Sequence, residues 1–195
     1  MSSHHFVKEG QEPALFILEA LSLEIAQPLL EWVPTVIVAD SAVEQVLQWG
    51  IKIDIVLQSK VPFRELEEML VNQIPIQIIS CKTDNVVAEG LQFLIENHST
   101  AVNFIAEPDA ELLKKLEKFI HQLQIGVFSK TQKWSAIVSI FEKWLPAGSK
   151  IAVKAHHSSG LQLQGLVQKG EEWETTNAGL VKVQARSPFW IGEWS

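Results

Sequence analysis

The chain has a single cysteine, Cys81, and no tyrosine among its 195 residues. One thiol can form neither an internal disulfide bond nor a multi-cysteine metal site, and the cytoplasm is therefore the expected compartment. Basic residues are also few, since 16 lysines and arginines face 23 aspartates and glutamates and give a formal net charge of -7. Phosphate backbones require a clustered basic face, so we expect no nucleic-acid partner. No apolar run approaches the roughly 18 residues of a membrane span, and we expect no membrane association.

The first two thirds of the chain alternate short apolar runs with amphipathic segments. The apolar runs are predicted strands at 14–19, 35–39, 53–58, 76–80, 101–106 and 125–129. The amphipathic segments are predicted helices at 21–32, 41–49, 62–73, 85–98 and 108–123. Within the first of these helices, Pro28 is expected to kink the helix or divide it into two pieces. This alternation is typical of an α/β fold with a mainly parallel sheet and flanking helices.

The pattern changes after about residue 129. Short β-prone segments separated by turn residues follow at 151–156, 161–168, 170–176, 180–185 and 188–194. They predict a small all-β sandwich. Residues 135–145 are interpreted as a helical connector that ends at Pro146. The predicted domains are therefore an α/β domain at 1–128 and a β-sandwich domain at 129–195.

Polar side chains directly follow three of the predicted parallel strands. Ligands of open α/β sheets bind beyond the carboxyl ends of the strands, which makes these residues candidates for a site. They are Asp40 with Ser41 and Ala42, then Ser59 and Lys60, then Cys81, Lys82, Thr83, Asp84 and Asn85. A purely structural alternative is that Asp40 caps the helix beginning near Ser41 and that Asp84 or Asn85 caps the next one. No glycine-rich nucleotide-binding loop is present.

Taken in order along the chain, these segments resemble the motifs of the thiamine pyrophosphokinase family. The Ala-Asp-Gly-Gly motif of that family corresponds to residues 39–42, its Leu-Gly-Ile-x-Pro-Asp motif to 49–54, and its Gly-Asp-Phe-Asp-Ser motif to 57–61. A family Asp-x-Thr-Asp element corresponds to residues 81–85 before the helix. Near the C-terminus, Ser-Thr-Ser-Asn and an aromatic run correspond to residues 174–177 and 187–190. The resemblance covers most of the chain and depends on order and spacing.

The resemblance implies a reaction and a set of site residues. Family members transfer a pyrophosphoryl group from ATP to thiamine, release AMP, and work as homodimers with the ligand between domains of different subunits. If this chain is active, the resemblance implies ATP and Mg²⁺ as cofactors. It assigns catalysis to Asp40 and Asp84 and a metal ion to Asp40, Asp54 and Asp84. The implied ligand-binding residues are Lys60, Lys82, Thr176, Asn177 and Trp190, of which Trp190 would form an aromatic wall against the thiazolium cation.

The chain departs from the family where the phosphates would bind. Ser41 and Ala42 replace two glycines that would let backbone amides approach a phosphate, because a Cβ atom obstructs that approach. A later Gly-Gly-Arg-x-Asp-His element is missing, and residues 107–111 read Glu-Pro-Asp-Ala-Glu instead. The preferred hypothesis is a thiamine pyrophosphokinase-like protein with little or no kinase activity. The alternatives are a non-catalytic module that binds thiamine or a nucleotide, a scaffold subunit, and an active enzyme with altered metal ligands.

Overall fold

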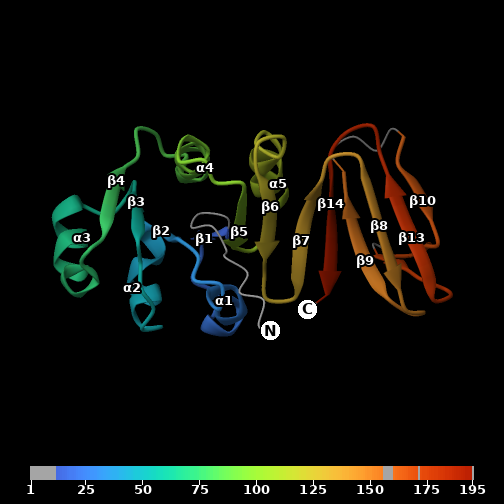
Figure 1. The fold of residues 1–195 in the computed structure, drawn as a ribbon, viewed down its shortest axis with the longest axis horizontal. Helices are drawn as coiled ribbons and strands as arrows, with labels where there is room; N and C mark the ends of the chain where they lie inside the picture. Colours follow the sequence, from blue (N-terminus) through green and yellow to red (C-terminus); the bar gives the residue numbers. More distant parts are fainter. Residues whose placement is uncertain (1–11, 156–159, 171, 195) are drawn as a thin grey trace, which may run out of the picture.

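A large mixed sheet organises the protein (Figure 1). The structure is a computed structural model that describes residues 12–155, 160–170 and 172–194. Among these residues, eleven strands form the large sheet in the order β11-β12-β9-β14-β7-β6-β5-β1-β2-β3-β4. A second, antiparallel sheet has the order β10-β13-β8. No helix of the described residues is both long enough and apolar enough to cross a membrane.

The six strands from β6 to β4 are parallel. Their bounds are β1 (Ala14–Ile17), β2 (Val36–Ala39), β3 (Ile55–Gln58), β4 (Gln77–Ser80), β5 (Ala101–Ile105) and β6 (Gln124–Phe128). Every residue of β1 and β2 is buried, as expected for strands covered by helices on both faces. The strand predictions from apolar runs are confirmed here to within two residues at each end.

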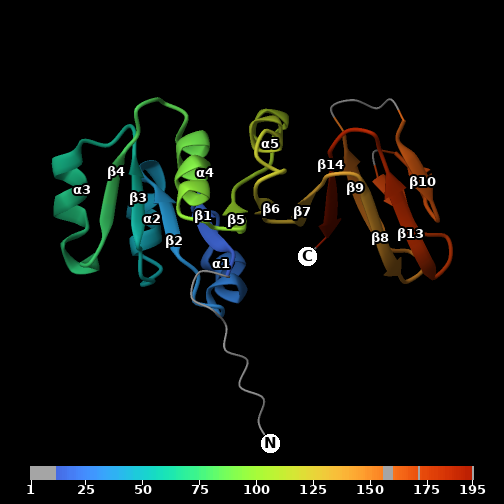
Figure 2. The same cartoon turned by 45° about the horizontal axis from the view of Figure 1, so that its top comes forward.

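Helices cover both faces of the parallel strands. One face packs against α4 (Val86–Glu96) and α5 (Ala110–Glu117), with Phe16 and Phe104 at the centre of that core. The other face packs against α1 (Leu23–Leu30), α2 (Val43–Leu47) and α3 (Phe63–Met69). Figure 2 shows α4 and α5 on the opposite side of the strands from α1. The first helix is a single one that contains Pro28, and short 3₁₀ turns, η1 (Asp40–Ala42) and η2 (Val71–Gln73), extend the second and third.

Antiparallel strands continue the large sheet beyond β6. They are β7 (Gln132–Ile137), β9 (Lys150–Lys154), β11 (Val167–Lys169), β12 (Glu172–Glu174) and β14 (Phe189–Trp194). The second sheet comprises β8 (Ile140–Leu145), β10 (Gln162–Gln164) and β13 (Gly179–Gln184). A third core, which includes Phe189 and Ile191 of β14 and Val181 and Val183 of β13, lies between the two sheets. Parallel pairing ends at β6, and the division into domains at residues 1–128 and 129–195 stays a prediction.

Two predictions for the C-terminal third are wrong in detail. Residues 135–145 form parts of β7 and β8, which belong to different sheets, and not a helical connector. The segment is rich in β-branched and aromatic residues, which favour strands when a partner strand is available. The predicted strand at 161–168 is divided into β10 and β11 by Gly165, whose φ of +79° bends the chain between the sheets.

Candidate functional site

Asp40 is the most constrained polar residue at the carboxyl ends of the strands. It follows β2 directly and is 3% exposed. Its Oδ2 accepts hydrogen bonds from the backbone N–H groups of Ser59 at 2.7 Å, Val61 at 2.8 Å, and Lys60. Oδ1 accepts a longer bond of 3.3 Å from the Ser59 hydroxyl. The carboxylate therefore fixes the loop after β3 and does not cap the helix that follows it, which corrects the capping interpretation of Asp40.

These hydrogen bonds also set the charge of Asp40. Burial by itself would raise the pKa of the carboxyl group, because it disfavours the ionised form. The backbone N–H groups of Val61, Lys60, Ser59 and Ser41 act in the opposite direction and lower the pKa below its ordinary value. Asp40 is thus a carboxylate whose negative charge is already stabilised by the protein.

The turn that begins with Asp40 has an ordinary helical backbone. Ala42 has φ of -102° and Val43 has φ of -56°, both right-handed values that any residue adopts. Both side chains are buried in the core beneath α1, α2 and α3. The turn therefore contributes to packing, and its backbone lacks the left-handed glycine conformations that form phosphate-binding nests.

A pocket of about 270 Å³ lies at the carboxyl ends of the parallel strands. It brings together Asp40, Lys60 and Asp84, which are three of the predicted site residues. Its charged lining consists of two lysines and six carboxylates, namely Lys60, Lys115, Glu19, Asp40, Asp84, Glu107, Asp109 and Glu111. The pocket is therefore acidic. Glu111 forms an ion pair of 2.8 Å with Lys115, and Asp109 accepts the N–H of Leu112 at 2.6 Å as the N-cap of α5.

Four of these acidic residues, Glu19, Glu107, Asp109 and Glu111, were not among the predicted site residues. Glu19 lies beyond β1, and Glu107 and Asp109 lie beyond β5, so both groups are at the same edge of the sheet as Asp40. The rule that identified Asp40 also applies to the ends of these two strands. The sequence signal for Glu19, Glu107 and Asp109 is their place shortly after the apolar runs 14–17 and 101–105.

The segment after β4 is held by Glu89 of α4. Its carboxylate accepts the backbone N–H groups of Lys82 at 2.9 Å and Thr83 at 2.6 Å, as well as the Thr83 hydroxyl at 2.8 Å. These bonds, the one from Lys82 first, lower the pKa of Glu89. Asn85 caps α4 by accepting the N–H of Ala88 at 3.2 Å, which confirms one of the two capping alternatives. Asp84 lines the pocket, whereas Lys82 does not.

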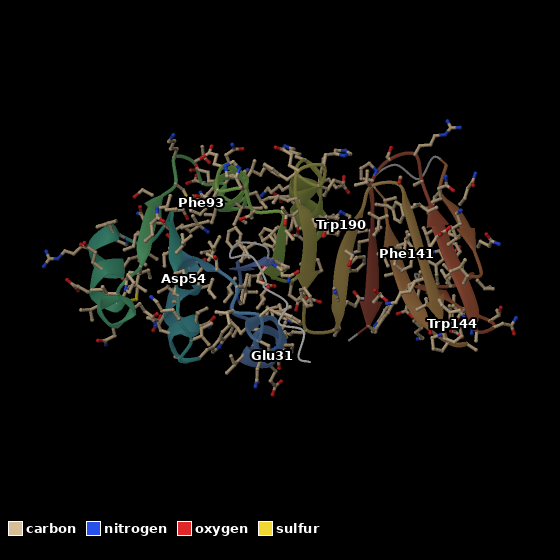
Figure 3. All side chains as sticks on the ribbon, viewed as in Figure 1. Glu31, Asp54, Phe93, Phe141, Trp144 and Trp190 are labelled. Carbon is tan, nitrogen blue, oxygen red and sulfur yellow. The ribbon has the colours of Figure 1, made fainter. Side chains whose placement is uncertain are left out.

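Asp54 lies away from the pocket. It precedes β3, at the amino end of that strand (Figure 3), whereas Asp40 directly follows the carboxyl end of β2. Its Oδ2 accepts the backbone N–H of Val36 at 2.9 Å. A strand of four residues spans about 13 Å, too far for one ion to join both carboxylates. The expected metal site of Asp40, Asp54 and Asp84 is corrected accordingly, and the described residues hold no group of three side chains arranged to bind a metal ion.

Trp190 is an interior residue of β14. It is 0% exposed, packs in the core beneath α4 and α5, and donates its indole Nε1–H to Oε1 of Glu117 at 3.1 Å (Figure 3). In this conformation the ring presents no face to a ligand. The sequence could not reveal this, because the covering helix α5 lies more than 70 positions earlier in the chain.

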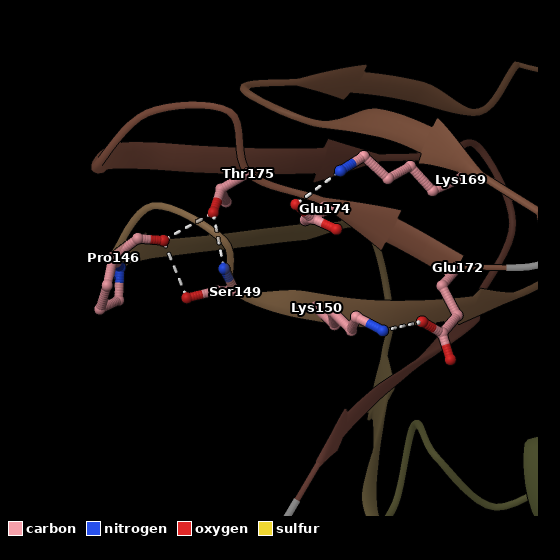
Figure 4. A network of polar contacts seen from close by, with 7 residues as sticks. All are labelled: Pro146, Ser149, Lys150, Lys169, Glu172, Glu174 and Thr175. Carbon is pink, nitrogen blue, oxygen red and sulfur yellow. Dashed lines mark hydrogen bonds and ion pairs between the residues drawn. The ribbon is translucent and has the colours of Figure 1, made fainter.

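Thr176 and Asn177 lie in the exposed turn between β12 and β13. The preceding residue, Thr175, is 1% exposed and anchors this turn (Figure 4). Its hydroxyl donates to the carbonyl of Pro146 at 2.6 Å and accepts the N–H of Ser149 at 2.9 Å. The two predicted ligand-binding residues are therefore accessible on a fixed support, but they do not line the pocket at Asp40.

The protein thus has a large mixed sheet with helices, an acidic pocket at the carboxyl edge of its parallel strands, and a separate antiparallel sheet. Solved thiamine pyrophosphokinases have this fold. The enzyme from Bacillus subtilis superposes with a TM-score of 0.68 at 10% identity over 93% of this chain and 99% of its own. The Candida albicans enzyme gives 0.66 at 6% identity over 94% and 89%, and the yeast enzyme gives 0.55 at 10% over 98% and 88%.

The similarity confirms the resemblance at the level of the fold. No sequence-family model matches the chain. No curated protein sequence matches it either. What the chain does with this fold must therefore be argued from its own residues.

Proposed function

We propose that this protein has the fold of a thiamine pyrophosphokinase without its transferase activity, and that it binds thiamine or a related small organic cation. The observation that carries the proposal is the environment of Asp40. Pyrophosphoryl transfer requires Mg²⁺ held by carboxylates so that the charge on the bridging oxygens is neutralised. Here Oδ2 of Asp40 already accepts three backbone N–H groups, and the carboxylate is nearly inaccessible. The residues present do not fit a catalytic magnesium site.

The charge of the pocket supports the choice of ligand. Six carboxylates and two lysines line it, so its potential is negative. A triphosphate without bound metal is repelled by such a lining, whereas the permanently charged thiazolium ring of thiamine is attracted. Asp84 is exposed at the pocket and is the carboxylate we assign to this contact. In the homodimer expected from the family, Thr176 and Asn177 of a second copy would supply the polar contacts.

Turnover is the decisive measurement. The protein is incubated with ATP, Mg²⁺ and thiamine, and AMP and thiamine diphosphate are quantified, with the Bacillus subtilis enzyme as a positive control. We expect no product above background, because loss of even one preorganised charge-stabilising group typically costs about 3 kcal/mol in the barrier. Turnover of about one per second would contradict the proposal and favour an active enzyme with altered metal ligands.

Binding is tested separately by calorimetry. We expect thiamine to bind and ATP without metal not to compete with it, because the acidic lining repels a triphosphate. The Asp84→Asn variant should weaken thiamine binding about tenfold, as expected when one ionic contact is removed. Asp54→Asn is the matched control, since it removes the same charge away from the pocket, and it should bind thiamine as the wild type does. If Asp84→Asn and the wild type bind thiamine with equal affinity, thiamine does not bind in this pocket.

A further inference from the structure

A second pocket lies along β5, β6 and β7, where no helix of the described residues covers the face of the sheet opposite α4 and α5. It reaches the segment before β6, where Ile120 and Leu123 also line it. On that face α1, α2 and α3 cover β1 to β4, and the second sheet covers β9 and β14. The three strands between these coverings, β5, β6 and β7, form the floor of a pocket of about 470 Å³. Figure 1 shows β6 and β7 between the helical part and the β-sandwich. Small-molecule sites occur preferentially at such boundaries between structural units.

The floor of this pocket is unusually polar for the middle of a sheet. Asn103, Gly126 and Ser135 lie directly opposite one another on the three neighbouring strands. Asn103 interrupts the apolar sequence of β5, in which Val102 and Phe104 are buried on the opposite face. Within the described residues its side-chain amide has no hydrogen-bonding partner. A polar group half-buried in a sheet without a partner is a place where a ligand gains hydrogen bonds.

Gly126 makes room for the amide of Asn103. A Cβ atom at this position would lie 2.9 Å from Oδ1 of Asn103, closer than side chains tolerate. The amide therefore extends over the glycine towards β7. The Ser135 hydroxyl lies on the next strand, so the amide and the hydroxyl line the same pocket.

A positive charge lies beside these two groups. Lys133 also lines the pocket, two residues before Ser135 on the same face of β7. Its cross-strand neighbour Glu193 forms an ion pair with Lys143 of β8, and the Lys133 ammonium lies over the ring of Phe128, at 5.2 Å from the centroid, with no ion pair among the described residues. Apolar walls are provided by Ile137, Val138 and Ile140. The pocket thus combines an amide, a hydroxyl, an ammonium group and an apolar wall.

From this arrangement we infer that the pocket on β5, β6 and β7 binds a purine nucleoside monophosphate. An Asn side chain pairs with the donor–acceptor edge of adenine through two hydrogen bonds, and a lysine ammonium pairs with a phosphate. Asn103 and Ser135 are two strand spacings apart, about 10 Å, and Lys133 lies about 7 Å further along β7. A nucleotide can therefore place its base against the Asn103 amide, its ribose near Ser135 and its phosphate at Lys133. The site is separate from the acidic pocket at Asp40.

Calorimetry with AMP tests this inference, with adenosine as the ligand that lacks the phosphate. We expect AMP to bind and adenosine to bind at least about tenfold more weakly, because the charge-assisted contact to Lys133 is lost. Asn103→Ala and Lys133→Ala should each weaken AMP binding by about the same factor. Lys60→Ala is the matched control, because it removes a lysine from the acidic pocket, and it should leave AMP affinity unchanged. Equal urea midpoints of the variants and the wild type verify that each is folded.

Three results would overturn the inference. One is the absence of heat with AMP at about 5 mM, where even a weak site is filled. Another is equal affinity for AMP and adenosine. A third is AMP binding that Lys60→Ala removes and Lys133→Ala leaves intact, which would put the nucleotide in the acidic pocket. Thiamine binding and turnover do not depend on Lys133, so these results are distinguishable from a failure of the proposed function.

Discussion

Substitution of Asp40 is expected to destabilise the fold, because its carboxylate holds the loop after β3. In Asp40→Ala, the backbone N–H groups of Ser59, Lys60 and Val61 lose a shared anionic acceptor. A hydrogen bond to a charged group contributes about 1.5–3 kcal/mol, and these N–H groups are only partly buried, so water replaces some of the loss. We therefore expect the free energy of unfolding to fall by about 3 kcal/mol in Asp40→Ala. Asp40→Asn keeps one acceptor oxygen and should lose about half as much.

The effect should depend on pH in a defined direction. The pKa of Asp40 is lower in the folded protein than in the unfolded chain, where it is about 3.9. The stability that the carboxylate contributes is therefore fully present above that unfolded value and is lost as the pH falls through the folded value. The difference between wild type and Asp40→Asn should be largest at pH near 7 and shrink towards about pH 3.

Urea unfolding followed by tryptophan fluorescence measures these changes, since the chain has seven tryptophans. Asp109→Asn is the control. Asp109 also lines the acidic pocket, but it is the N-cap of α5, and asparagine is an equally good N-cap. That variant should unfold at the wild-type midpoint. If Asp40→Ala unfolds at the wild-type midpoint, or if its loss is the same at acidic and neutral pH, the structural role of Asp40 is refuted.

Three further predictions concern other parts of the molecule. We expect a homodimer whose interface involves the C-terminal strands, because Trp144 and Leu180 are paired across β8 and β13 and are 62% and 61% exposed. Replacing both residues by serine should change the mass measured by light scattering from that of a dimer to that of a monomer. A monomeric wild-type protein would contradict this prediction. Trp190→Ala should lower the free energy of unfolding, measured in urea, by about 4 kcal/mol, because the substitution leaves a cavity in the core. Wild-type stability combined with about tenfold weaker thiamine binding would instead show that Trp190 contacts the ligand. Burial, followed by the charges of Glu89 and Asp40, raises the pKa of Cys81 to about 11. Alkylation of this thiol at about pH 8 should therefore be roughly a hundredfold slower in the folded protein than in the urea-unfolded protein. Equal alkylation rates would contradict the burial of Cys81.

The sequence by itself determined the local elements of the α/β part. The apolar runs Ala14–Ile17 and Val36–Ala39 have no polar face, which requires burial on both sides and thus parallel strands beneath helices. Asn85 caps its helix by a contact only three residues long, and the local sequence therefore left only Asp84 and Asn85 as candidates for that cap. The resemblance to a family also came from local order and spacing. These features depend on neighbours along the chain.

The tertiary structure decided where the polar groups lie. The partners of Asp40 are 19 to 21 residues away, and Trp190 is buried by a helix residue 73 positions before it. Asp54 and Asp40 belong to neighbouring strands, but the parallel arrangement puts them at opposite edges. The floor of the second pocket joins residues 103, 126 and 135, which meet only through strand register. Strand register and the packing of layers are set by contacts between segments that are distant in the sequence. The order of residues along the chain does not specify these contacts directly.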